Sequence, residues 1–144
     1  MIQRIQTIFL FLASVMAVGT NFLAFGIEWK NSNPDGIWLG TNTANTTNLI
    51  LFFCIILTGG LSFAAIFLFK NRALQLKTTL AASLFALMSL GITCYWIYFD
   101  TTTDTQRYPS VGAFIPMGII LALLFAVKNI KKDETLVKSM DRLR

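Results

Sequence analysis

The 144-residue chain contains no histidine, only two cysteines and only three prolines. Histidine is the commonest metal ligand and the usual general base near neutral pH, so its absence counts against metal sites and histidine-dependent catalysis. Charged residues are also scarce, at 13% of the chain against about 25% in soluble domains. The composition therefore disfavours a soluble enzyme, and we expect no catalytic residue, no cofactor and no metal.

Four long stretches lack every Lys, Arg, Asp and Glu: residues 5–27, 49–69, 78–99 and 108–127. A helix rises about 1.5 Å per residue, so roughly 20 apolar residues cross a hydrocarbon core about 30 Å thick. The stretches predict an all-α membrane protein with four spans, folded as a single domain over residues 1–144. The first stretch could also be a cleaved secretory signal, but its apolar character continues to Ile27, which favours an uncleaved span.

The connections between the predicted spans indicate how the helices pack. Residues 70–77 and 100–107 are short links, which favour antiparallel neighbours and an up-down-up-down four-helix bundle. The longer segment 28–48 contains Asn33-Pro34-Asp35-Gly36, a strong turn signal. We therefore expect a small hairpin-like loop at one mouth of the bundle.

The positive charges predict the orientation. If the spans alternate in direction, ten of the twelve Lys and Arg residues fall on one side, together with both termini. Cytoplasmic loops collect such charges, so both termini should be cytoplasmic and the 28–48 loop should lie outside. The basic pI of about 9.5 is explained by this orientation and by anionic lipid, so we expect the lipid bilayer as a partner and no nucleic acid.

All three tryptophans and all three tyrosines lie at or beyond the outer ends of the predicted spans. Amphipathic rings favour the headgroup region, so an aromatic belt is the simpler interpretation. The alternative is an outward contact surface for a lipid or a protein partner. The tryptophans in question are Trp29, Trp38 and Trp96, and the tyrosines are Tyr95, Tyr98 and Tyr108.

Small and hydroxyl side chains recur at helical spacing inside the spans, whereas ionisable carboxylates and amines do not occur there. In lipid, such stripes typically mark faces where helices approach closely, and the lack of buried charge disfavours transport or proton relay. A hydrophilic path along the bundle axis, with Asn21 as its most polar member, is the alternative. The stripe residues are Thr7, Ser14, Ala17, Asn21, Thr58, Ser62, Ala65, Thr79, Ala82, Ala86, Ser89, Thr93, Gly118, Ala122 and Ala126.

The two cysteines, Cys54 and Cys94, lie at similar distances from the outer ends of adjacent predicted spans. No Cys-x-x-Cys pair and no nearby basic residue activates either thiol, so inert buried thiols are the simplest interpretation. A structural disulfide and thiol–quinone redox chemistry remain open.

The tail, residues 128–144, predicts a cytoplasmic amphipathic basic helix. Leu136, Val137, Met140 and Leu143 fall on one helical face, and Glu134 precedes Lys138 by four residues. Such a helix can lie on the inner leaflet or dock a partner. For docking, the candidate residues are Arg4, Leu136, Val137, Met140, Arg142 and Leu143, with the three tryptophans on the outer side.

The termini also carry a resemblance. The opening MIQRIQT and the closing KKDETLVKSMDRLR resemble a family of small four-span inner-membrane proteins of Bacteroidota, catalogued as a domain of unknown function. The resemblance implies a bacterial inner membrane and a periplasmic outer loop. It implies no activity, substrate or catalytic residue.

Two functions fit these observations. The first is a non-catalytic structural or accessory subunit of a bacterial inner-membrane assembly, bound to a membrane-protein partner or to further copies of itself. The second is a small lipid- or quinone-binding membrane protein, with possible redox activity at Cys54 and Cys94.

Overall fold

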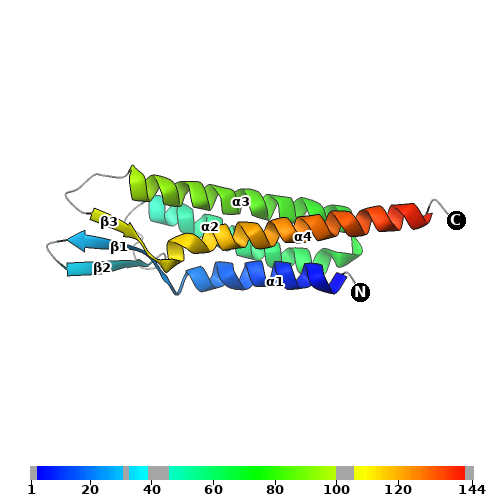
Figure 1. Ribbon diagram of the computed structural model, residues 1–144, viewed down its shortest axis with the longest axis horizontal. Helices are drawn as coiled ribbons and strands as arrows, with labels where there is room; N and C mark the ends of the chain where they lie inside the picture. Colours follow the sequence, from blue (N-terminus) through cyan, green and yellow to red (C-terminus); the bar gives the residue numbers. More distant parts are fainter. Residues whose placement is uncertain (1–2, 31–32, 39–45, 100–105, 142–144) are drawn as a thin grey trace.

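The computed structural model describes residues 3–30, 33–38, 46–99 and 106–141, with four α-helices and a small sheet (Figure 1). The elements in chain order are α1 Gln3–Thr20, β1 Ala24–Lys30, β2 Asn33–Trp38, α2 Thr46–Phe67, the 3₁₀ turn η1 Leu68–Lys70, α3 Arg72–Tyr98, β3 Gln106–Pro109 and α4 Val111–Asp141.

The helices form an elongated bundle in which consecutive helices lie side by side and α4 returns to pack on α1. Figure 1 shows the start of α1 and the end of α4 at one end of the bundle, here named the terminal end. The strands lie at the opposite end, here named the sheet end. The predicted all-α class with four helices is confirmed.

Three helices in the described part of the chain are long and apolar enough to cross a membrane: Asn48–Lys70, Arg72–Tyr98 and Val111–Val137. The apolar helix at the start of the chain, Ile5–Thr20, is shorter. The predicted first span, residues 5–27, is therefore wrong in its last third, because the chain leaves the helix after Thr20 and enters β1 at Ala24.

Local hydrogen bonds explain this early end of α1. The Asn21 amide nitrogen Nδ2 donates to the carbonyl oxygens of Ala17 (3.3 Å) and Val18 (3.2 Å), satisfying acceptors that a helix end leaves open. The backbone N–H groups of Asn21 and Phe22 then donate to carbonyls three residues back, which tightens the turn. Asn21 thus ends α1, while the apolar sequence continues as strand.

The strands form one antiparallel sheet in the order β2-β1-β3. In β1, Ile27 pairs with Gly36 of β2 on one side and with Tyr108 of β3 on the other. The turn predicted at residues 33–36 is wrong, because these residues are strand β2 and pair with residues 27–30. Pro34 can occupy this position because β2 is an edge strand, where a residue without an N–H is tolerated; residues 31–32, between the strands, lie outside the described residues.

Helix α4 is continuous from Val111 to Asp141, so the predicted tail helix continues the last span without a break as far as Asp141. Likewise α3 begins at Arg72, six residues before the predicted span. The Asn71 side chain caps it by accepting from the backbone N–H of Leu74 at 3.3 Å.

Candidate functional site

Small side chains line much of the bundle interior, beside larger ones such as Leu10, Ile55 and Leu123. The stripe predicted from the sequence is buried at nearly every position, as expected for helices that approach closely in lipid. Thr7 is exposed while its neighbour Gln6 is buried, and Asn21 and Gly118 are half-buried. The buried members are Ser14, Ala17, Thr58, Ser62, Ala65, Thr79, Ala82, Ala86, Ser89, Thr93, Ala122 and Ala126.

The buried hydroxyl groups are satisfied within their own helices. Each of seven hydroxyl groups donates to a backbone carbonyl three or four residues earlier in its own helix, at 2.7–2.8 Å. These donors therefore need no partner on a neighbouring helix. The interior is therefore a packing face whose hydroxyl donors point back to backbone. The residues are Ser14, Thr20, Thr58, Ser62, Thr79, Ser89 and Thr93.

Asn21, the predicted member of a hydrophilic path, uses its amide nitrogen to end α1. Its oxygen Oδ1 is buried and accepts no hydrogen bond in the described part of the chain. A single such atom at the end of a helix does not make a path.

Two side chains tie α4 to its neighbours at the terminal end. Gln6 Nε2 donates to the carbonyl of Asn129 at 3.1 Å, and Arg72 Nη1 donates to the carbonyl of Asp133 at 3.0 Å. These bonds hold α4 against α1 and α3 close to the point where α4 leaves the bundle.

The predicted partner-binding residues of the tail have different placements. Leu136 lies on α4 with 44% of its side chain exposed, and Val137 beside it is half-buried. Arg4 and Met140 lie within α1 and α4, but their side chains are outside the described residues, as are Arg142 and Leu143 altogether. The structure therefore places only Leu136 and Val137 on a described surface.

The six aromatic residues do not form one exposed belt. Trp96 is only 4% exposed, because it continues the inward stripe of α3 after Ser89 and Thr93. The surface placement predicted for Trp96 is therefore wrong, whereas Tyr95, Tyr98 and Tyr108 are exposed. Trp29 lies in β1 opposite Pro34 and Trp38 lies in β2 opposite Ala24, with side chains outside the described residues.

Cys54 and Cys94 are both free thiols. Cys54 is buried and Cys94 is exposed, so the two side chains face different surroundings. The disulfide left open by the sequence is not formed, because similar depth along two helices does not place two residues on facing sides. Among the described residues no group of three or more His, Cys, Asp or Glu could hold a metal ion.

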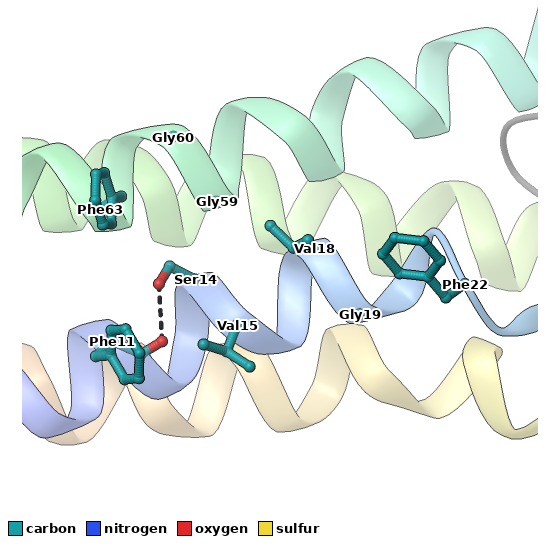
Figure 2. Close-up of a pocket in the computed structure, with 9 residues that line it drawn as sticks. All are labelled: Phe11, Ser14, Val15, Val18, Gly19, Phe22, Gly59, Gly60 and Phe63. Carbon is teal, nitrogen blue, oxygen red and sulfur yellow. Dashed lines mark hydrogen bonds between the residues drawn. The ribbon is translucent and has the colours of Figure 1, made fainter.

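A hollow of about 550 Å³ lies between α1 and α2 (Figure 2). Its single polar side chain, Ser14, donates through Oγ to the carbonyl of Phe11 at 2.8 Å. The hollow is therefore apolar throughout. Its lining residues are Phe11, Ser14, Val15, Val18, Gly19, Phe22, Gly59, Gly60 and Phe63.

Sequence reasoning missed this hollow. The available signal was the adjacent pair Gly59-Gly60 in the middle of an apolar helix, since two missing side chains leave a dent in a helix surface. The groove forms only when α1 packs against α2, because its lining residues come from both segments.

The fold and the surface define a class, that of small helical proteins suited to a membrane. Comparison with family-level sequence patterns matches residues 2–143 to the family described as Domain of unknown function (DUF4293), and the chain belongs to that family. Searches of curated proteins and of solved structures give no match.

Proposed function

We propose that this protein is a non-catalytic accessory subunit of a bacterial inner-membrane assembly, and that the far end of α4 is its docking element. The observation that carries the proposal is the continuation of α4 to Asp141, past the level at which α1 and α3 begin at the terminal end (Figure 1). A helix that leaves its own bundle while keeping an exposed Leu136 offers an apolar anchor to another protein.

The orientation of the proposal follows the charges. Lys70, Lys77, Lys128, Lys131 and Lys132 are all exposed. Lys70 closes the turn between α2 and α3, Lys77 lies near the start of α3, and the other three lie in the second half of α4, which ends at the terminal end. Positive residues collect on the cytoplasmic side, so we place the terminal end in the cytoplasm and the sheet in the periplasm. The docking element then faces the cytoplasm.

Charge pattern favours a protein over a lipid surface as the partner of this element. Glu134 interrupts the basic residues, which weakens simple attraction to anionic lipid. Mixed charges beside an apolar anchor suit directional ion pairs with a protein.

The test compares Leu136→Ala with Leu124→Ala, a matched control on the same helix. Leu124 is 54% exposed but lies within the apolar part of α4. After mild solubilisation, native mass spectrometry should find the 16.1 kDa chain in a complex of fixed stoichiometry with a second membrane protein. Leu136→Ala should lower its recovery at least five-fold, and Leu124→Ala should leave it unchanged.

Equal recovery for both variants would remove the docking element from the proposal. A chain recovered only as a monomer, or only with copies of itself, would overturn the accessory role.

A second candidate function is lipid or quinone binding in the membrane, favoured by the apolar hollow between α1 and α2. The unpaired and differently buried thiols offer no support for redox activity at Cys54 and Cys94, so this candidate is a binding function alone.

A further inference from the structure

Two neighbouring glycines have opposite roles in shaping the hollow between α1 and α2. A Cβ atom at Gly59 would lie 3.1 Å from Cβ of Ala17, so this glycine lets the two helices approach closely. A Cβ atom at Gly60, or at Gly19 on α1, would meet nothing within 4 Å. Gly59 therefore allows close contact between α1 and α2. Gly60 and Gly19 leave unfilled space at the bottom of the hollow, here named the floor.

Three phenyl rings bound this floor. Figure 2 shows Phe11 and Phe63 toward one end of the hollow and Phe22 toward the other. All three rings are exposed, and Val15, Val18, Gly19 and Gly60 line the hollow between them. The result is a groove with glycines at its floor and aromatic and valine side chains around them.

The length of the groove matches one leaflet of a bilayer. Eleven residues separate Phe11 from Phe22, which is roughly 16 Å at the helical rise, and half of the hydrocarbon core is about 15 Å. Phe22 lies just beyond the end of α1 at the sheet end, and Phe11 lies near the middle of the helix. The groove therefore runs from mid-membrane to the membrane edge on the sheet side.

The volume of the groove distinguishes a hydrocarbon chain from a protein helix. An apolar cavity of about 150 Å³ holds one benzene, so by that ratio about 550 Å³ holds about twenty carbon atoms. A helix about 10 Å wide and about 16 Å long occupies about 1,300 Å³. A helix would rest on the three phenyl rings and leave the floor empty, which forfeits contact energy.

We propose that this groove binds one acyl chain of a phospholipid from the leaflet on the sheet side, with the chain parallel to α1. The proposal deepens the second candidate function above, and it rests on the bundle crossing a membrane. The only polar group of the lining is already bonded within α1, so the groove recognises the tail by packing and leaves the headgroup beyond Phe22. Because bulk lipid is equally apolar, selectivity comes from fit rather than from the hydrophobic effect.

The test fills the floor with a side chain and uses a matched glycine elsewhere as the control. Gly60→Leu places its side chain in the groove, where the backbone leaves room for it. Gly91→Leu is the control, because Gly91 is an exposed glycine of α3 with nothing within 4 Å and no part in the groove. Helical content and thermal midpoint in detergent establish that both variants fold.

Two measurements read out binding. Native mass spectrometry after mild solubilisation counts retained phospholipid, and vesicles containing phosphatidylethanolamine with a photoactivatable acyl chain locate its contacts by cross-linking. We expect about one phospholipid per wild-type and Gly91→Leu chain, a loss of at least five-fold in Gly60→Leu, and cross-links at Phe11, Phe22 or Phe63.

The other outcomes separate the two levels of the proposal. Phospholipid retained equally by Gly60→Leu, with cross-links elsewhere, would overturn the groove while leaving lipid binding intact. A retained isoprenoid quinone in place of phospholipid would overturn the acyl assignment. No retained lipid in wild type and no cross-link would overturn both the groove and the lipid-binding function.

Discussion

At the scale of single residues, the absence of a side chain decides more than its presence. Gly59 and Gly60 are adjacent in sequence, yet one faces Ala17 across a tight helix contact and the other faces open space. Gly118 shows a third case, because a Cβ atom there would meet only the flexible end of Met16, at 2.5 Å from its Cε. A glycine can therefore allow a close helix contact, leave open space, or occupy a position where a larger residue fits after a neighbouring side chain moves. Which of these applies depends on the atoms opposite it.

This difference predicts the stability of two alanine variants. Gly60→Ala should be neutral or stabilising, because alanine is favoured over glycine in a helix by about 1 kcal/mol and nothing obstructs the methyl group. Gly59→Ala should be less stable than Gly60→Ala by about 1 kcal/mol, since Ala17 belongs to a rigid helix and α1 must shift. Thermal midpoints in detergent measure the difference, and equal midpoints would contradict the close contact.

The cysteines give a second prediction at this scale. Brief treatment of the detergent-solubilised protein with N-ethylmaleimide should add one group, at Cys94, because Cys54 is buried. Unfolding in denaturant should expose both thiols and give two adducts without any reductant. Intact-mass analysis before and after denaturation measures this, and a thiol count that rises only after reduction would show that a disulfide exists.

At the scale of elements, α1 and α4 depart from the simple span pattern in opposite directions. Helix α1 stops at Thr20 although the apolar sequence continues. The chain can leave the helix here because β1 is the central strand, paired on both edges, so its backbone groups still have partners. Helix α4 instead continues past the apolar sequence and is tied down at Asn129 and Asp133.

The tie at Asp133 predicts the mobility of the α4 extension. Arg72→Met removes the bond from the guanidinium to the Asp133 carbonyl, a contribution of about 1 kcal/mol for a half-buried group. Amide hydrogen exchange at residues 134–141 should then rise by roughly five-fold, with residues 119–127 unchanged as the internal control. Unchanged exchange in the extension would show that the bond does not hold α4.

At the scale of the whole molecule, the orientation in the membrane is the property that the proposals share. In a background with Cys54→Ala and Cys94→Ala, an impermeant maleimide should label Thr43→Cys in intact spheroplasts and should not label Leu74→Cys. The expected result follows from the positive residues at the terminal end. Labelling of Leu74→Cys with protection of Thr43→Cys would reverse the orientation and place the groove in the cytoplasmic leaflet.

The sequence by itself determined the class of the molecule, because the class depends on the length of the apolar stretches and on the periodicity of small residues within them. Apolar length predicted the three long helices, and the small-residue stripe predicted the packing face from Ser14 and Ala17 to Ser89 and Thr93. Each of these follows from helical periodicity and from the cost of charge in lipid, both of which are local properties.

Only the tertiary structure decided the points that depend on two segments meeting. Residues 33–36 carry a strong turn signal, but pairing with β1 makes them strand, and Trp96 turns inward because its register on α3 follows the buried stripe. The two cysteines lie at similar positions along their helices, but Cys54 is buried and Cys94 is exposed. Gly59 and Gly60 have different surroundings because only Gly59 faces α1. The groove exists because one glycine admits a neighbouring helix while the next faces away from it, a relation between two helices that neither segment contains alone.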